Sequence, residues 1–534
     1  MATTEFAFLD YLVFGLYAVA IVAIGLWVSR EKGGKEKDAQ DYFLASKSLP
    51  WWAIGASLIA SNISAEQFIG MSGSGFRLGL AIATYEWMAA ITLLVVAWFF
   101  LPIFIQKGIF TMPQFLEDRY DSRVRTLLAV FWLSVFVFVN LTSVLYLGAQ
   151  AMETIMGVPL FWGMAGLATF AVVYSVYGGL KAVAWTDVVQ VAVLIFGGLI
   201  TTWIAVDAYG GFGKLYADFS DRFNMILFKD ELKYFDNEGL KQDAYFDLPG
   251  LSVLIGGMWI ANLYYWGCNQ YIIQRALAAK SIKEAQRGVA FAGYLKLLLP
   301  LIVVIPGIVA YAMDAPIEKA DEAYPWLLGK FVPVGLKGLA FAALVAAIVS
   351  SLASMMNSTS TIFTMDLYKP FLDKGASQKR LVMVGRIVAV VAMFIAGLVA
   401  YPLLGQSDQV FRDIQDYTGM VSPGVLAVFI LGLFWKKATP NAALVSAFLS
   451  VPLSLGINAL FGEGENQLPF MDRMGIVFLI SAALIVVISL IEGKRKDHPK
   501  GISLSDIKRE KDPIFTAAAM GIIVITTLLY VVFW

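Results

Sequence analysis

Hydrophobic residues follow one another along this chain in long blocks that are separated by short polar connections. Most blocks hold about 20 or more residues, which is the length a helix needs to cross the hydrocarbon core of a bilayer. The pattern therefore predicts an all-α integral membrane protein with fourteen transmembrane helices. The predicted spans are 9–29, 51–72, 79–105, 124–156, 158–177, 182–207, 249–270, 286–313, 333–366, 379–402, 410–434, 440–461, 469–491 and 514–533.

Composition supports the same class of protein. Of the 534 residues, 59% are hydrophobic and 15% are charged, whereas soluble domains carry about 25% charged residues. The 40 basic and 40 acidic residues cancel, so nothing favours nucleic acid as a partner. Cys268 is the only cysteine, so disulfides within the chain and cysteine-based zinc or redox sites are excluded. His498 is the only histidine. Without a nucleotide loop or a histidine near the polar centre, we do not expect an enzyme.

Basic residues concentrate in the loops after the first, third, seventh, ninth, eleventh and thirteenth predicted spans. Loops rich in lysine and arginine usually face the cytoplasm. The chain is therefore predicted to be a multi-pass protein of the plasma or bacterial inner membrane, with both termini on the external side. The polar segment 208–248 is then an external loop, for which we expect one short helix.

Polar residues interrupt several spans at membrane depth, where each ionisable group costs about 2.5–3.5 kcal/mol or more. The second span continues into ASNISAEQFIGMSGSG, and the seventh reads GGMWIANLYYWGCNQYIIQR. Glu86, Asn140 and Lys296 lie inside otherwise apolar spans. A structural role remains open for each of them, because an interhelical hydrogen bond would explain Asn140 and an ion pair would explain Lys296.

The two interrupted spans occupy matching places in the chain. Each is the first of five consecutive spans, in the sets 51–207 and 249–434. Interrupted helices at corresponding positions in two halves are typical of inverted-repeat transporters, which bind their solute near the membrane midplane. This spacing favours transport over a channel, a sensor or an enzyme.

Three stretches resemble the sodium:solute symporter family, and within it the sodium/galactose and sodium/glucose cotransporters. They are YFLASKSLPWWAIGASLIASNISAEQFIGMSGSG, VYGGLKAVAWTDVVQ and AAIVSSLASMMNSTSTIFTMD. The resemblance runs from about Tyr11 to Trp534. It implies a LeuT-like fold with a five-plus-five inverted-repeat core. The implied parts are an additional N-terminal helix and cytoplasmic loop (1–50), the first repeat (51–207), the external loop (208–248), the second repeat (249–434) and three additional C-terminal helices (435–534).

The resemblance implies that Na⁺ is the co-transported ion, and no prosthetic group is expected. Its ligands would be the backbone carbonyls of Ala60, Ile63 and Ala347 and the hydroxyls of Ser350 and Ser351. Oxygen ligands suit a small, hard cation. Asp187 would lie on the inward exit route of Na⁺, although a charge at the cytoplasmic end of a helix is an alternative interpretation.

The resemblance also implies uptake of a hexose, galactose or glucose, by alternating access. Amides, a carboxylate and an ammonium can together satisfy sugar hydroxyls, which both donate and accept. Tyr265 would stack beneath the sugar as the inner gate, and Met71, Tyr85 and Phe411 would cover it from outside. The implied sugar-binding residues are Asn62, Gln67, Glu86, Asn140, Ala261, Asn262, Lys296 and Gln415.

Two points leave alternatives open. Ala89 stands where the family pattern has a hydroxyl residue, so the preferred hexose is undecided. A symporter of the same family for sialic acid, a vitamin or an amino acid, a sugar sensor and a Na⁺ leak channel are all compatible with the spans. An anionic solute is disfavoured by Glu86. Glu66 has no assigned role. The expected partners of the protein are a small sugar and membrane lipid.

Overall fold

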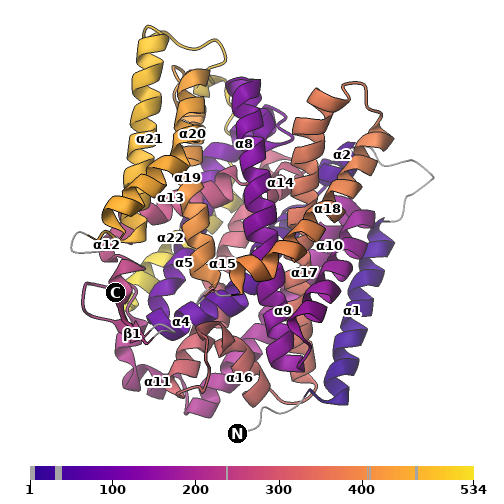
Figure 1. Cartoon of the computed structure of the whole chain (residues 1–534), viewed down its shortest axis with the longest axis vertical. Coiled ribbons are helices and arrows are strands. Elements are labelled where there is room, and N and C mark those ends of the chain that lie inside the picture. The colour runs from indigo at the N-terminus through magenta and orange to yellow at the C-terminus, as the bar shows by residue number, and fades with distance from the viewer. Residues whose placement is uncertain (1–5, 30–38, 236–238, 406, 408–409, 463–466) are drawn as a thin grey trace.

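The computed structural model describes residues 6–29, 39–235, 239–405, 407, 410–462 and 467–534, which form a nearly all-helical molecule (Figure 1). Within these residues, eleven helices are long and apolar enough to cross a membrane, or twelve if one bent pair counts as a span. The count of fourteen is not confirmed. The two predicted spans that fall short are 51–72, which is broken, and 158–177, where the apolar helix Leu160–Val173 is short.

Helices of three kinds and one pair of short strands make up the described chain. The α-helices are α1 (Phe8–Ser29), α2 (Ala39–Leu44), α3 (Trp51–Asn62), α4 (Ser72–Leu78), α5 (Thr84–Val95), α6 (Leu101–Gln106), α7 (Met112–Arg119), α8 (Ser122–Val135), α9 (Thr142–Met156), α10 (Leu160–Tyr209), α11 (Phe212–Asp218), α12 (Gly250–Ile255), α13 (Gly257–Leu263), α14 (Gln270–Leu277), α15 (Ile282–Ala312), α16 (Ala323–Phe331), α17 (Leu336–Ile362), α18 (Gln378–Leu404), α19 (Val410–Phe434), α20 (Pro440–Phe461), α21 (Phe470–Glu492) and α22 (Pro513–Val532). The π-helical segments are η2 (Glu66–Met71), η4 (Val96–Phe100), η5 (Phe136–Leu141), η8 (Tyr264–Cys268) and η10 (Phe363–Leu372). The 3₁₀ segments are η1 (Ala45–Lys47), η3 (Gly79–Ala83), η6 (Ser220–Phe223), η7 (Ala244–Phe246), η9 (Ala320–Glu322) and η11 (Leu504–Asp506), and the strands are β1 (Lys233–Phe235) and β2 (Lys241–Asp243).

The second predicted span breaks after Asn62. Ile63 has extended backbone angles (φ −78°, ψ 107°), which end α3 before η2 begins. Side chains replace the lost helical hydrogen bonds, because Ser64 N donates to Gln67 Oε1 (3.0 Å) and Glu66 N donates to Ser64 Oγ (3.1 Å). Polar residues inside this apolar span therefore satisfy a backbone that would otherwise lack partners at membrane depth.

The seventh predicted span is interrupted twice. Gly256 separates α12 from α13, and the two helical pieces meet at 78°. Asn269, with extended angles (φ −84°, ψ 122°), separates η8 from α14. Gly257 lies directly against the backbone of Met471 in α21, so a side chain there would collide with it. The glycine pair and the amides of this span thus mark true breaks, as the sequence predicts.

Helix α10 bends at Gly179, which has φ +62° and ψ −169°. A Cβ atom there would lie 2.6 Å from Tyr42 O, so this position requires glycine for both its angles and its space. The bend falls in the gap between the predicted spans 158–177 and 182–207.

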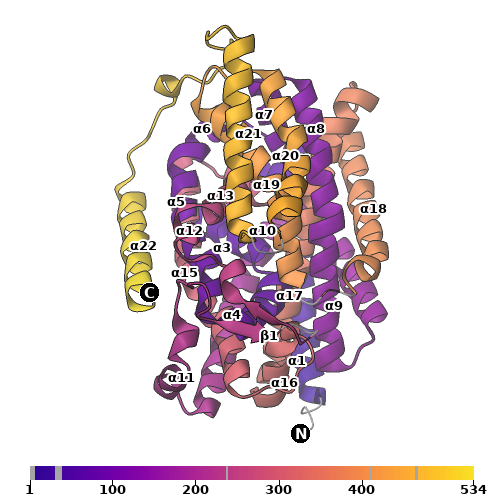
Figure 2. The same cartoon turned by 60° about the vertical axis from the view of Figure 1, so that its left-hand side comes forward.

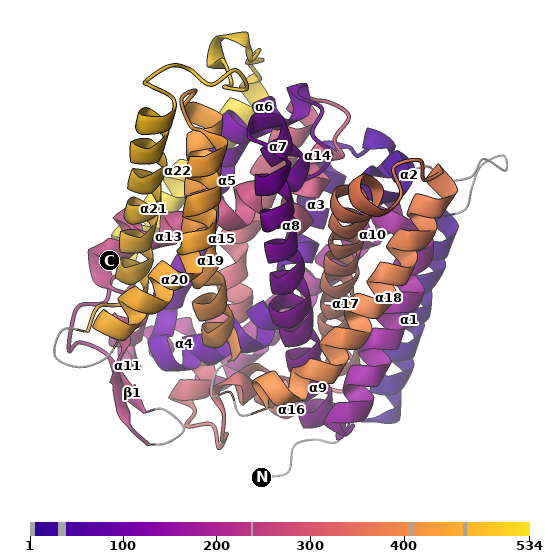
Figure 3. The same cartoon turned by 45° about the horizontal axis from the view of Figure 1, so that its top comes forward.

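The loop at 208–248 contains the expected short helix, α11, and also an antiparallel β1–β2 pair that the sequence analysis did not predict. Figures 1 and 2 show α11 and β1 at the same end of the molecule as the N-terminus. Helices α6 and α7 lie at the opposite end (Figures 2 and 3). The loop therefore shares one face of the molecule with the start of the chain.

Helices α1, α10, α17 and α18 pack side by side on one flank of the molecule, and α20 and α21 lie on the other (Figure 3). Helix α1 is anchored by Asp10, whose fully buried carboxylate accepts from the backbone N–H groups of Gly335 (2.7 Å) and Gly338 (2.9 Å). These groups belong to the beginning of α17. The first helix is thereby tied to the helix that carries Ala347, Ser350 and Ser351.

Candidate functional site

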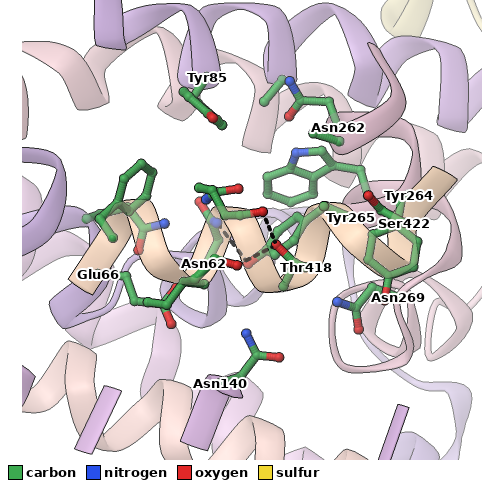
Figure 4. Close-up of a pocket in the computed structure, with 18 of the residues that line it drawn as sticks. Asn62, Glu66, Tyr85, Asn140, Asn262, Tyr264, Tyr265, Asn269, Thr418 and Ser422 are labelled. Atoms are coloured by element: carbon green, nitrogen blue, oxygen red, sulfur yellow. Dashed lines mark hydrogen bonds between the residues drawn. The ribbon is translucent and has the colours of Figure 1, made fainter. Parts of the chain in front are cut away.

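A central cavity lies where the two broken spans meet. Its empty volume is about 810 Å³, open solvent at its mouth included. Figure 4 shows Tyr85 and Asn262 on one side of the space and Asn140 on the opposite side. Every residue expected at the sugar site or its gates lines this cavity: Asn62, Gln67, Met71, Tyr85, Glu86, Asn140, Ala261, Asn262, Tyr265, Lys296, Phe411 and Gln415.

A continuous hydrogen-bonded chain crosses the cavity wall. Lys296 Nζ donates to Glu86 Oε2 and to Asn62 Oδ1, and it lies 5.0 Å from the centre of the Trp266 ring. Asn62 Nδ2 in turn donates to Tyr265 OH (2.9 Å). The ion pair is buried, since Lys296 is 1% exposed and Glu86 is 2% exposed. The lysine therefore has a structural partner, and the pair brings no net charge to the cavity.

Several amide atoms at the cavity lack hydrogen-bond partners among the described residues. They are Asn140 Oδ1, Asn262 Nδ2 and Asn269 Oδ1. An unsatisfied buried polar atom costs about 1–3 kcal/mol. A ligand that both donates and accepts hydrogen bonds would remove this cost, and a polyhydroxylated molecule does both.

Aromatic rings close the cavity on the side of the 208–248 loop. The Tyr85 and Phe411 rings meet edge to face with centroids 5.6 Å apart. Phe411 packs on Gly70, where a Cβ atom would lie 2.6 Å from Phe411 Cβ. Phe411 is 3% exposed and Met71 is 1% exposed. Tyr85 and Phe411 therefore pack against each other, and Met71 follows Gly70, on which Phe411 packs.

Three backbone carbonyls converge on one hydroxyl at the break after α3. Ser351 Oγ lies 3.4 Å from both Ala60 O and Ile63 O, and 3.2 Å from Ser61 O. Ala347 lies one helical turn before Ser351 on α17. Of the predicted Na⁺ ligands, the oxygens of Ala60, Ile63 and Ser351 therefore lie together. The carbonyl of Ser61 lies with them and was not among the predicted ligands.

Asp187 is 0% exposed and lies within α10, beside this oxygen cluster. Its carboxylate accepts hydrogen bonds from Ser350 Oγ and Ser57 Oγ. Ser57 Oγ accepts from Arg275 Nε (3.0 Å). Asp187 is therefore not exposed to solvent in this structure. The bond also turns the Ser350 hydroxyl toward Asp187 in this structure.

The structure adds cavity residues that the sequence analysis did not select. Glu66 lines the cavity and accepts a hydrogen bond from Ser143 Oγ (2.9 Å). Thr418 and Ser422 follow Gln415 on one face of α19, so helical spacing could have identified them. The remaining lining residues that sequence reasoning missed are Val135, Tyr264, Trp266, Asn269, Ile414, Gly419, Phe470 and Met474.

Comparison with known proteins identifies the family. Residues 42–449 match the model of the sodium:solute symporter family. The chain belongs to this family. A sodium/glucose cotransporter of Vibrio parahaemolyticus is 52% identical to it over an alignment of 552 positions, gaps included. The alignment covers 99% of this chain and 98% of that protein. The sodium/myo-inositol cotransporter 2 of Homo sapiens is 35% identical over 491 residues, which cover 86% of this chain and 71% of that protein.

A solved structure supports the fold. The Na⁺-coupled sialic acid symporter, in a substrate-bound outward-open state, matches with a TM-score of 0.77 and 23% identity, over 91% of this chain and 98% of that one. This member of the sodium:solute symporter family is therefore a multi-pass membrane protein with a LeuT-like helical fold, and it couples the movement of a solute to that of Na⁺.

Proposed function

We propose that this symporter carries a hexose, galactose or glucose, into the cell together with Na⁺. The observation that carries the proposal is the central cavity, in which a neutral Glu86–Lys296 pair stands beside unpartnered asparagine amides. A sugar hydroxyl can accept from Lys296 and donate to Glu86. The 52% identity to a protein named sodium/glucose cotransporter supports the same solute class.

The charge of the cavity favours a neutral solute. Glu86 and Lys296 compensate each other, and Glu66 is a further acidic residue in the wall. A carboxylate solute such as sialic acid would meet no free cation among the lining residues that the structure describes. Leaving the charge of such a solute buried without a partner would cost several kcal/mol.

Coupling between the two ligands follows from the break after α3. We propose that Na⁺ binds the carbonyls of Ala60 and Ile63, that of Ala347, and the hydroxyls of Ser350 and Ser351. Asn62 stands between Ala60 and Ile63 in the chain, and its side chain belongs to the sugar cavity. Each ligand would order the same turn of backbone. Binding of Na⁺ would therefore raise the affinity for sugar, and by linkage the reverse also holds.

Alternating access would work with the two sets of helices as inverted repeats. We propose that 51–207 and 249–434 are the repeats, preceded by 1–50, linked by the external loop 208–248 and followed by 435–534. Tyr265 would be the inner gate, and Met71, Tyr85 and Phe411 the outer one. The basic loops would face the cytoplasm and both termini the exterior. Asp187 would then receive Na⁺ on its way inward.

One Na⁺ per sugar would be sufficient for accumulation. A unit charge moving through about 100 mV releases about 2.3 kcal/mol. A tenfold Na⁺ gradient adds about 1.4 kcal/mol. Together these terms support sugar accumulation on the order of several hundred-fold.

Uptake into proteoliposomes tests the proposed solute. Labelled galactose, glucose, myo-inositol and sialic acid are compared in parallel, each with an inward Na⁺ gradient and with K⁺ in its place. We expect Na⁺-dependent uptake of at least one hexose, while sialic acid stays at background. Preference for myo-inositol would overturn the hexose assignment, and sugar-gated current without accumulation would indicate a sensor. Comparing galactose with glucose also decides the hexose preference that Ala89 leaves open.

A further inference from the structure

Phe470 stands where the central cavity meets two other cavities. It is the first residue of α21 and lines the central cavity together with Met474, one turn later. Phe470 also lines an outer cavity that Tyr85 and Phe411 border, with an empty volume of about 800 Å³, open solvent included. It lines a third cavity between α19, α20 and α21, with an empty volume of about 460 Å³ on the same measure. Among the lining residues, Phe470 is the one that all three cavities share.

The position of the Phe470 ring depends on a glycine. A Cβ atom at Gly419 of α19 would collide with Phe470 Cζ and would lie 2.7 Å from its Cε2. The ring therefore rests on the backbone of α19, between Gln415 and Ser422 of the central cavity. Met474 completes the contact, with Sδ 3.3 Å from the same Cβ position. This arrangement places an apolar wall beside the polar side chains of Gln415 and Ser422.

The cavity behind the ring, which we call the side pocket, is lined by both apolar and polar residues. Its polar residues are Asp416, Ser454, Asn458 and Arg473. Arg473 Nη1 donates to Asn458 Oδ1, and Ser454 Oγ donates to Met420 O (3.0 Å). Carboxylate, hydroxyl, amide and guanidinium groups are the side chains that pair with sugar hydroxyls. The side pocket thus has the chemistry for a second sugar ring, but the Phe470 ring stands between it and the first.

We propose that Phe470 is a specificity-determining residue that limits the central site to a single sugar ring. The proposal rests on the proposed hexose function. The ring closes the central cavity toward the side pocket, so that a disaccharide meets an aromatic wall. Removing the ring makes the two cavities continuous and places polar groups within reach of a second ring. The wall comes from α21, which lies outside the 51–434 segment that would hold the two repeats.

Inhibition of Na⁺-driven uptake of labelled galactose tests this role. The inhibition constants of unlabelled galactose and of lactose, which carries a galactose ring plus a second ring, are measured for the wild-type protein and for Phe470→Ala. We expect the lactose-to-galactose ratio of these constants to fall at least about tenfold in the variant, because even one extra methylene in an apolar pocket discriminates by about 10- to 200-fold. An unchanged ratio in a folded, galactose-transporting variant overturns the proposal.

A matched variant excludes a general loosening of α21. Phe478→Ala removes the same atoms two turns further along the helix, where Phe478 packs against the hydrophobic core and is not among the cavity-lining residues. The lactose-to-galactose ratio of Phe478→Ala should equal that of the wild-type protein. An equal fall of this ratio in Phe470→Ala and Phe478→Ala overturns the proposal.

Two further outcomes are decisive. If Phe470→Ala does not fold, Phe470→Leu takes its place, because leucine keeps an apolar contact with Gly419. This variant should still lower the lactose-to-galactose ratio, by a smaller factor. An unchanged ratio in Phe470→Leu counts against the proposed role of the Phe470 ring. Absence of Na⁺-driven hexose uptake in the wild-type protein overturns the proposed function and this inference together. Wild-type uptake with an unchanged ratio in the variants overturns the inference alone.

Discussion

Replacing Glu86 with glutamine removes one charge of the buried pair and leaves the Lys296 ammonium with neutral acceptors. Lys296 would keep its bond to Asn62 and its place near the Trp266 ring, which only partly compensate the charge. Breaking a buried ion pair by removing one partner costs about 3–5 kcal/mol. Glutamine still offers an acceptor oxygen, so we expect Glu86→Gln to lower stability by about the lower end of this range.

The same change should weaken sugar binding. A hydrogen bond to a charged group contributes about 1.5–3 kcal/mol, and each 1.4 kcal/mol corresponds to a factor of ten. The KM for the sugar should therefore rise about 10- to 100-fold at saturating Na⁺. The assay is initial uptake in proteoliposomes, with thermal unfolding in detergent measured on the same preparations.

A double variant separates the lost charge from the lost contact. Glu86→Gln combined with Lys296→Met removes both charges, so no ammonium stays buried without a partner. Because the two residues touch, their effects on stability should not add, and the double variant should be more stable than the sum of the single changes implies. Additive losses, or a normal KM in Glu86→Gln, would refute the role assigned to the pair.

Three other changes test separate parts of the molecule. Ser351→Ala should raise the half-saturating Na⁺ concentration about tenfold, as the loss of one neutral oxygen worth about 1–1.5 kcal/mol implies; unchanged Na⁺ dependence would exclude this hydroxyl as a ligand. Tyr265→Phe removes the acceptor of Asn62 Nδ2 and should speed sugar efflux relative to uptake, measured from preloaded vesicles; equal rates would count against an inner gate. The hydrogen bond from Arg287 lowers the pKa of Asp512 below its ordinary value. This ionised group therefore stabilises the fold above the ordinary aspartate pKa of about 3.9, and the contribution disappears as the pH falls through the lower folded-state pKa. Asp512→Asn should consequently lower the melting temperature most at pH 7 and progressively less as the pH falls below the ordinary aspartate pKa, and a loss that does not change with pH would contradict this linkage.

The sequence predicts the breaks better than it predicts the number of spans. Asn62 and Ser64, and the glycines at 256 and 257, are too costly inside a continuous membrane helix, so they reveal where the backbone leaves it. The span count depends on length, and a broken segment such as α3 is too short to qualify. The β1–β2 pair escaped prediction because three-residue strands leave almost no periodic signal.

The candidate site, like the fold, could be predicted only in part from the sequence. The polar residues expected at the sugar site line one cavity. Their polarity at membrane depth singles most of them out, and the resemblance to the symporter family assigns them to the sugar. Phe470 and Met474 could not be found in this way, since apolar residues in an apolar helix are indistinguishable from lipid-facing or core residues. The bond between Ser350 and Asp187 joins α17 to α10, and such a contact depends on tertiary packing that no local pattern encodes.

Na⁺-driven accumulation of sugar is the property on which the proposed function depends. Proteoliposomes with an inward Na⁺ gradient and an inside-negative potential receive labelled galactose or glucose at equal concentration on both sides. We predict that the internal sugar rises well above the external level, and that the rise collapses when the Na⁺ gradient is dissipated. Equilibration without accumulation, or accumulation that does not depend on Na⁺, would contradict Na⁺-coupled hexose symport.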